Sequence, residues 1–508
     1  MTWQVNGVTG GNSTEGAISA NGLYTAPSAV PNPASVTVSA IPQADPTKSA
    51  SATVTIVNFT NTTLNGTYVF TATLADGRTL RFVGGTFQAD GAGNLTNGME
   101  DVIGSGGVST NQPFSGTYSV GPGGLGSATV NLDAGGTDTF AFALASSAQG
   151  QFIEYDGLDA TFGVVRKQDA SAISALAGTF IFSLQGTGLG IVGSINLNGS
   201  ANVSGTEDIN DAGSFQAMVP FTGTYSLSSQ GHGTATWTNS NGTSNFVFYI
   251  IDGQTVEFLS IDSGGAGQAI AQEGGLTFGN SSLGGSIAFF ASGVPIDVAG
   301  ILDTDAAGNI NAGILDEDSN NGLIYGIDGT PVTGTYNVAA NGRGTANLII
   351  SSDEGVTVPL VFWLASAGSG VLLETDGTVL TGAILAQQGG PFTTSSMQGN
   401  FAFGMNGGFC EGCGEEGTWF DSVGQFAADG AGNLAGTEDY YLTGVGLAFP
   451  GVITDGSYSI AANGRGTGQL SSGSLGTLPL IFYLVNPAEA IMLSATPALP
   501  LVGLAEKQ

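Results

Sequence analysis

One short stretch occurs four times along the chain, and this repetition constrains the fold more than any other feature. The copies are GGTFQADGAGNLTNGMEDV (84–102), VGSINLNGSANVSGTEDIN (192–210), AGILDTDAAGNINAGILDED (299–318) and VGQFAADGAGNLAGTEDYY (423–441). Each copy predicts a strand, a tight turn of Asp or Asn with Gly, and a return strand, because Gly and Asn tolerate the positive φ of such turns. The sequence therefore predicts four similar β modules in tandem.

Two further signatures follow in every module. The second signature starts at Phe114, Phe221, Val332 and Thr454, and the third reads TFAFALA, NFVFYII, PLVFWLA and PLIFYLV. All connections have hairpin length, which excludes a parallel sheet because parallel strands need long crossovers. We expect an all-β fold with antiparallel modules at 60–169, 170–275, 276–391 and 392–508. An eight-stranded up-and-down barrel is favoured because closure removes exposed edges, and a two-sheet sandwich is the alternative.

The third signature alternates with period two, which assigns one face to the module core. In the first module this face carries Phe140, Phe142 and Leu144. The opposite face is also apolar in the later modules, where it holds Tyr249, Trp363 and Tyr483. A strand that is apolar on both faces is covered on both. Either the module's own loops or contacts between neighbouring modules or chains provide this cover.

Residues 1–59 differ from the modules and read as short antiparallel strands between Gly, Pro and Asn turns. The motifs WQVNG from Trp3, GLYTAP around Tyr24 and the closing ATVTI resemble the bacterial immunoglobulin-like domains of surface proteins. The tandem modules are similar to repeats of acidobacterial extracellular proteins. The first resemblance implies an Ig-like sandwich, of which residues 1–59 supply about half.

The charge balance excludes several classes of partner. The chain has 8 Lys and Arg residues against 40 Asp and Glu residues, for a formal charge of -32. Such a surface repels phosphate backbones and anionic lipids, so we expect no nucleic-acid partner. We also expect no transmembrane segment, because no apolar run is long enough to span a bilayer as a helix. The composition suits an extracellular or cell-surface protein.

Few residues carry the chemistry that an enzyme needs. The only His, His232, occupies a position filled by Leu125, Arg343 and Arg465 in the other modules, which we interpret as an exposed hairpin tip. Cys410 and Cys413 form the only cysteine pair, and a local disulfide is favoured over free thiols or a metal site because no second pair exists. We expect no catalytic residues.

The repeated acids of the opening hairpins offer oxygen ligands, and calcium is the one cofactor that they indicate. The candidate ligands are Asp90, Asp101, Asp305, Asp318, Asp429 and Asp439. Turn chemistry alone also explains these motifs, so the hypothesis is that calcium binds weakly if at all.

These features lead to two hypotheses for function. The first is a non-enzymatic structural or adhesive protein, a semi-rigid rod or filament subunit that self-associates when another chain donates a strand to residues 1–59. The alternative to strand donation is that the sequence is cut and that the missing strands of this domain lie upstream. The candidate interface residues of this first hypothesis are Trp3, Tyr24, Tyr249, Trp363 and Tyr483. The alternative is an array of barrels on the cell surface that binds small ligands or glycans, because eight-stranded barrels enclose small molecules.

Overall fold

The chain is described by a computed structural model. It describes residues 1–508 except 21, 23, 28–29, 57, 77–78, 105, 156–159, 174–175, 294–295, 320–321, 324–328, 352–354, 408–418, 443–446, 473–475 and 497–499. The chain divides into two compact units. Residues 1–60 and 120–124 form the first, and residues 61–119 and 125–508 form the second.

The first unit contains two small antiparallel sheets. One has the order β2-β1-β6-β7 and the other the order β3-β4-β5. Their strands are β1 (Thr2–Val5), β2 (Val8–Thr9), β3 (Gly11–Asn12), β4 (Gly16–Ile18), β5 (Tyr24–Thr25), β6 (Ser35–Ile41) and β7 (Ala50–Thr55). Val5, Ile18, Val36 and Ile56 form their small apolar core.

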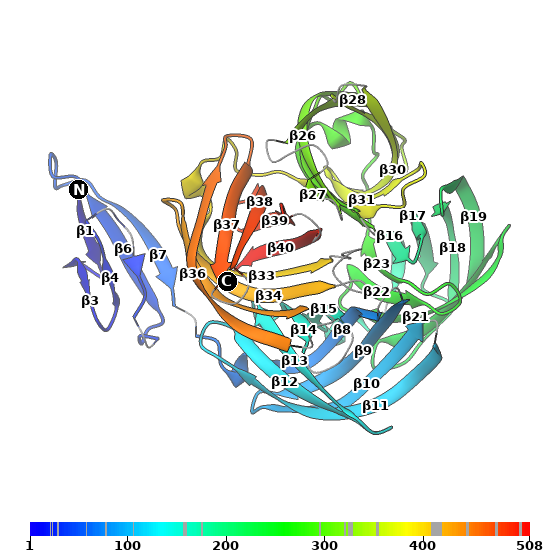
Figure 1. Cartoon of the computed structure of the whole chain (residues 1–508), viewed down its shortest axis with the longest axis horizontal. Helices are drawn as coiled ribbons and strands as arrows, with labels where there is room; N and C mark the ends of the chain where they lie inside the picture. The colour runs from blue at the N-terminus through cyan, green and yellow to red at the C-terminus, as the bar shows by residue number, and fades with distance from the viewer. Residues whose placement is uncertain are drawn as a thin grey trace. The chain divides into compact units, whose positions relative to one another are not determined.

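The second unit contains four closed antiparallel barrels, which we number 1 to 4 in chain order (Figure 1). The strands of barrel 1 are β8 (Asn65–Asp76), β9 (Thr79–Asp90), β10 (Asn94–Gly104), β11 (Gly107–Val120), β12 (Leu125–Leu132), β13 (Thr137–Leu144), β14 (Gln149–Glu154) and β15 (Ala160–Lys167). The strands of barrel 2 are β16 (Ala177–Gly186), β17 (Leu189–Asn198), β18 (Asn202–Asp211), β19 (Ser214–Leu227), β20 (His232–Asn239), β21 (Gly242–Ile250), β22 (Thr255–Ser260) and β23 (Ala266–Ala271).

Barrels 3 and 4 repeat this order. The strands of barrel 3 are β24 (Gly285–Gly293), β25 (Ile296–Thr304), β26 (Asn309–Ser319), β27 (Gly322–Leu323), β28 (Thr330–Val338), β29 (Arg343–Ile350), β30 (Val356–Ser366), β31 (Ser369–Glu374) and β32 (Thr381–Ala386). The strands of barrel 4 are β33 (Gln398–Gly407), β34 (Phe420–Asp429), β35 (Asn433–Leu442), β36 (Leu447–Ile460), β37 (Arg465–Ser472), β38 (Gly476–Asn486), β39 (Glu489–Ser494) and β40 (Leu501–Lys507). In barrel 3 the short strand β27 pairs only with β26, and the pairing of β25 with β26 closes the barrel.

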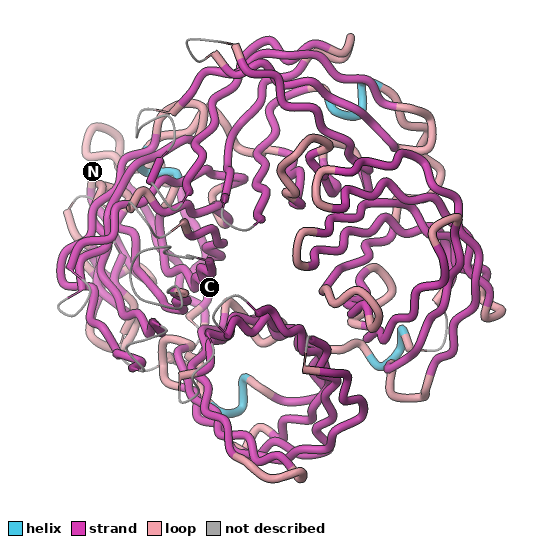
Figure 2. The backbone as a smooth tube through the Cα atoms, turned by 45° about the vertical axis from the view of Figure 1, so that its right-hand side comes forward, coloured by secondary structure: helices cyan, strands magenta, loops and turns pink. Residues whose placement is uncertain are grey.

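Among the described residues, helix is confined to short 3-10 turns, which Figure 2 shows as isolated cyan segments in a backbone made mostly of strands. These turns are η1 (Asn61–Thr63), η2 (Ala170–Ala172), η3 (Asn280–Leu283) and η4 (Thr394–Ser396), and one precedes each barrel. The described part of the chain contains no helix with the length and apolarity of a bilayer-spanning segment.

In barrels 1 and 4, the tyrosine of the second signature binds the residue that follows the 3-10 turn. The Tyr118 hydroxyl donates to the Leu64 carbonyl over 2.7 Å, and the Tyr458 hydroxyl donates to the Met397 carbonyl over 2.6 Å. Leu64 is only 5% exposed and Met397 only 1% exposed. The repeated tyrosine therefore satisfies a backbone carbonyl at the end of the barrel, where the polar group has few other partners.

The prediction of barrels is confirmed, and so is the inward stripe of the third signature. Phe142 and Leu144 line the interior of barrel 1, and Phe482 and Leu484 lie in the core of barrel 4. The outward residues of the same strand are covered by another barrel. Ala141 and Ala143 of barrel 1, for example, pack with Val423 of barrel 4.

Within the second unit, the barrels contact one another in cyclic order. The first two strands of a barrel pack on the last three strands of the next, as β16 and β17 do on β30 and β31. The same contact joins β33 and β34 of barrel 4 to β13 and β14 of barrel 1, which lie side by side in Figure 1. The expectation of a semi-rigid rod is therefore wrong, because a linear string of modules does not bring the fourth onto the first.

Candidate functional site

A buried ion pair joins barrel 2 to barrel 3. The Arg343 guanidinium forms a bidentate ion pair with the Asp208 carboxylate, with Nη2 2.7 Å from Oδ1 and Nε 2.9 Å from Oδ2. The Trp363 indole N–H donates to the same Oδ2 over 2.9 Å. Asp208 is 0% exposed. Its charge is thus compensated by the paired geometry that guanidinium and carboxylate favour.

Two other joints repeat this arrangement. At the joint of barrels 3 and 4, Arg465 Nε lies 2.7 Å from Asp316 Oδ2, and the Tyr483 hydroxyl contacts the same oxygen. At the joint of barrels 1 and 2, His232 Nε2 lies 3.0 Å from Asp101 Oδ2. The interpretation of the His232 position as an exposed hairpin tip is therefore wrong, because the strand that carries it faces the preceding barrel.

The electrostatics of Asp101 show how such a joint keeps its charge. Burial by itself raises the pKa of Asp101, but hydrogen bonds from His232 and Tyr249 outweigh burial and lower that pKa below its ordinary value. The Tyr249 hydroxyl also lies 2.8 Å from the Gly84 carbonyl of barrel 1. Asp101 is therefore an ionised acceptor between two barrels.

The joint of barrels 4 and 1 is different. Barrel 1 has Leu125 and Ala143 at the positions that hold a basic and an aromatic residue at the other joints, and Asp439 is the acid at the equivalent position of barrel 4. Here Ala143 packs with Val423 and with Tyr441, which is only 1% exposed. Apolar contacts and a hydrogen bond from the Gln149 side-chain amide to the Glu506 carboxylate join these two barrels.

A glutamine at the end of each barrel links all four joints. The side-chain amides of Gln168, Gln272, Gln387 and Gln508 donate to the main-chain carbonyls of Ile250, Leu364, Leu484 and Leu144 over 2.7, 2.8, 2.7 and 2.7 Å. The acceptor is always the same position of the next barrel. Because the same hydrogen bond occurs at equivalent positions of all four repeats, the cyclic arrangement follows from a contact that every repeat contains.

These joints account for three of the five predicted interface residues. Tyr249, Trp363 and Tyr483 are each at most 2% exposed, because neighbouring barrels of the same chain cover them. The prediction that they offer contact area to another chain is wrong for that reason. Trp3 and Tyr24 pack in the small core of the first unit, and the Tyr24 hydroxyl donates to the Glu15 carbonyl.

The candidate calcium ligands fall into two separate groups. Asp90, Asp305 and Asp429 lie at the hairpin tips, where Asp429 Oδ1 accepts from the N–H of Ala431 over 2.7 Å and of Asn433 over 2.9 Å. Asp101, Asp318 and Asp439 lie at the joints, and Asp318 Oδ2 accepts from Ser494 over 2.6 Å. Asp101 of β10 lies opposite Gly84 of β9 in the sheet register. Asp90 is the last residue of β9, about 20 Å along that strand from Gly84, so the two groups of acids are far apart. The described residues contain no group of three or more His, Cys, Asp or Glu side chains that could hold a metal ion.

The predicted disulfide of Cys410 and Cys413 lies outside the described residues. It stays a prediction.

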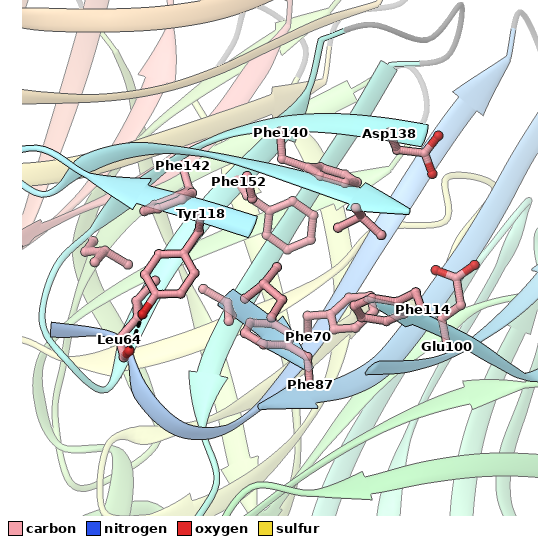
Figure 3. A pocket seen from close by; sticks show the side chains of 15 residues that line it. Leu64, Phe70, Phe87, Glu100, Phe114, Tyr118, Asp138, Phe140, Phe142 and Phe152 are labelled. Carbon is pink, nitrogen blue, oxygen red and sulfur yellow. Dashed lines mark hydrogen bonds between the residues drawn. The ribbon is translucent and has the colours of Figure 1, made fainter. Parts of the chain in front are cut away.

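Barrel 1 encloses the largest of the cavities described in the four-barrel unit, with a volume of about 100 Å³ (Figure 3). Cavities of about 50 Å³ in barrel 2 and about 30 and 60 Å³ in barrel 3 are smaller. Aromatic residues make up seven of the fifteen residues that line the cavity in barrel 1. They are Phe70, Phe87, Phe114, Tyr118, Phe140, Phe142 and Phe152.

One substitution between the repeats explains much of the difference in volume. Val130 faces Asp138 across strands β12 and β13, and Trp237 faces Ser244 at the same register in barrel 2. Trp237 stacks on Phe246 with ring centroids 3.8 Å apart and on Phe221 with centroids 4.9 Å apart. Valine at this position leaves open the volume that the indole fills in barrel 2.

Two carboxylates lie at one end of the cavity in barrel 1. Glu100 of β10 and Asp138 of β13 line this end, and Figure 3 shows them opposite the end that Leu64 and Tyr118 occupy. Burial, followed by the charges of Asp138 and Asp101, raises the pKa of Glu100 to about 7. An apolar chamber with acids at one end has the properties of a small-molecule site.

The sequence analysis did not identify this site. A signal was present, because the four repeats carry Val130, Trp237, Leu348 and Leu470 at one inward position. Its meaning depended on knowing that the module is a closed barrel, in which a small residue leaves space at the centre.

Comparison with known proteins adds little to this geometry. No protein-family model matches the chain, and no curated protein matches its sequence. Among solved structures, the isotype 1 transferrin-binding protein B of serogroup B Neisseria meningitidis aligns over 72% of this chain and 83% of its own, with 12% identity and a TM-score of 0.20. A mutant transferrin-binding protein B of Haemophilus parasuis Hp5 aligns over 73% and 85%, with 10% identity and a TM-score of 0.17. Values this low do not establish a common fold.

Proposed function

We propose that the protein is a non-catalytic binding protein of the cell surface or extracellular space. In this proposal barrel 1 takes a small ligand into its aromatic interior, and barrels 2 to 4 serve as a scaffold that holds barrel 1 in a fixed setting. The supporting observation is the contrast between Val130 and Trp237, because one repeat keeps open a space that another repeat fills. Packing a core to full density is the usual state of a purely structural barrel.

The cyclic contacts support a scaffold role for the other barrels. Each joint is formed by buried groups within one chain, such as Asp208 with Arg343 and Asp316 with Arg465. Aromatic residues that would otherwise supply contact area for a filament are occupied in these joints. A charge of -32 also fits an exposed, soluble surface better than a surface that binds anionic partners.

An exchange of residues between barrels tests the proposal. Benzene is a suitable neutral probe, because apolar cavities of similar size bind it, and a bound ligand raises the melting temperature by mass action. We expect benzene to raise the melting temperature of the natural protein and to have no such effect on V130W, whose indole fills the chamber.

The reciprocal variant W237V is the matched control. It opens barrel 2 and is expected to gain a response to benzene in the V130W background. Circular dichroism shows whether each variant remains folded. The proposal is overturned if benzene leaves the melting temperature of the natural protein unchanged, or if folded V130W responds as strongly as the natural protein.

A further inference from the structure

We infer that the ligand of barrel 1 is a small organic cation with an alkylated ammonium group. This inference rests on the proposed function and specifies its ligand class. The observation that supports it is the combination, in one chamber, of aromatic residues in the walls and two acids at one end.

The aromatic walls present ring faces and edges in several directions. Phe70 lies at their centre, with its ring centroid 6.1 Å from Phe87, 6.0 Å from Phe114 and 6.3 Å from Phe152. Phe140 meets Phe152 edge to face at 5.6 Å. Rings around a small chamber attract a cation through their quadrupoles, and alkylated ammonium groups suit such a cage because they need no hydrogen-bond acceptors.

Glu100 of barrel 1 lacks the hydrogen-bond donor that the equivalent glutamates of barrels 2 and 4 have. In barrel 2, Asn239 Nδ2 donates to Glu207 Oε1 over 2.6 Å, and in barrel 4, Ser422 Oγ donates to Glu438 Oε1 over 3.0 Å. Barrel 3 has Leu315 at this position. Within the described part of the chain, no group donates a hydrogen bond to Glu100. A half-buried carboxylate beside a second one is electrostatically unfavourable, and a bound cation removes that cost.

The same features argue against other ligand classes. An anion would meet Glu100 and Asp138 at the charged end of the chamber. A metal ion needs a shell of oxygen ligands, and the described residues offer no such group here. The overall charge of -32 raises the local concentration of cations around the protein.

Choline and its uncharged isostere 3,3-dimethyl-1-butanol provide the test, with binding measured by titration calorimetry. We expect the natural protein to bind choline at least about tenfold more tightly than the isostere, the size of effect that a desolvated cation–π contact produces. E100Q should lose about tenfold in affinity for choline and keep its affinity for the isostere, which also shows that the variant is folded. E207Q, the same change in barrel 2, should leave both affinities unchanged.

The outcomes separate the two proposals. Equal affinity for choline and the isostere overturns the cation inference and leaves the binding function in place. An E100Q variant that binds choline as tightly as the natural protein also overturns it. If neither compound binds and benzene has no effect, the binding function itself is wrong.

Discussion

The side-chain amide of Gln508 donates a hydrogen bond to the main-chain carbonyl of Leu144 over 2.7 Å, and so joins the last residue of the chain to the first barrel. The same contact links Gln168 to Ile250 between barrels that are consecutive in sequence. In each case the glutamine that ends one barrel donates a hydrogen bond to a main-chain carbonyl of the next barrel. The same contact therefore forms the joints between consecutive barrels and the joint that closes the cycle.

Removal of this closing contact should loosen one joint only. In Q508A the Leu144 carbonyl loses its donor, and we expect a cost of about 1 kcal/mol, typical of a lost hydrogen bond. Hydrogen exchange should rise in β13 and β34 and stay unchanged in β30. Equal exchange in all three strands in variant and natural protein would contradict the role of Gln508.

The ion pair of Asp208 and Arg343 should matter far more than a surface charge. In D208A the Arg343 guanidinium and the Trp363 N–H lose their common acceptor, and breaking a buried pair costs about 3–5 kcal/mol. We expect a clear fall in melting temperature by calorimetry. D303A, which removes an exposed acid of barrel 3, is the control, and an equal fall in both variants would argue against the joint.

Stability should decrease from pH 5 to pH 8. Burial raises the pKa of Asp297 to about 7 and that of Asp421 to about 8, against smaller opposing hydrogen bonds from Ser292 and Gly407. An unfolded aspartate loses its proton near pH 4, whereas the folded protein keeps these two protons to higher pH. Their contribution is therefore fully present below about pH 4 and is lost as the pH rises through the folded pKa, on the order of 4–6 kcal/mol for each group.

Thermal unfolding of D421N across this pH range checks the assignment. Asparagine cannot ionise, so the decrease in melting temperature between pH 5 and pH 8 should be smaller than in the natural protein. D303N is the control, and a pH dependence unchanged by D421N would show that Asp421 is not the group responsible.

Calcium removal should leave the hairpin turns intact. The Asp90 carboxylate accepts from the Ala92 N–H over 2.7 Å and from the Asn94 N–H over 3.0 Å, so the turn satisfies its own acid. We expect EDTA to leave the melting temperature unchanged, because only a bound ligand couples to stability. A fall of many degrees would establish a calcium site.

Under the proposed extracellular location, Cys410 and Cys413 are expected to form a disulfide. Mass spectrometry of peptides prepared without reduction should find the two residues linked. The C410S/C413S variant should change the melting temperature little, because the loop that the bond closes is very short. Two alkylatable thiols in the unreduced protein would show that the bond is absent.

The joints show where sequence reasoning went wrong. Leu125, His232, Arg343 and Arg465 suggest a tolerant surface position, because Leu, His and Arg all occur there. The position instead varies together with Ala143, Tyr249, Trp363 and Tyr483 on the next strand. Barrel 1 has an apolar residue at both positions, and each of the other barrels has a basic residue paired with an aromatic residue. That pairing becomes visible only when the two strands are known to face the preceding barrel.

The sequence by itself determined the strands, the turns, the four modules and the inward stripe of Phe140 and Phe142, because period two and glycine-containing turns act over a few residues. Tertiary structure alone decided that barrel 4 meets barrel 1 and that Asp208 meets Arg343. It also decided that Val130 lines a cavity of about 100 Å³ and Trp237 a smaller one of about 50 Å³. Such facts depend on which distant side chains converge when a sheet closes on itself, and no local period in the sequence encodes that convergence.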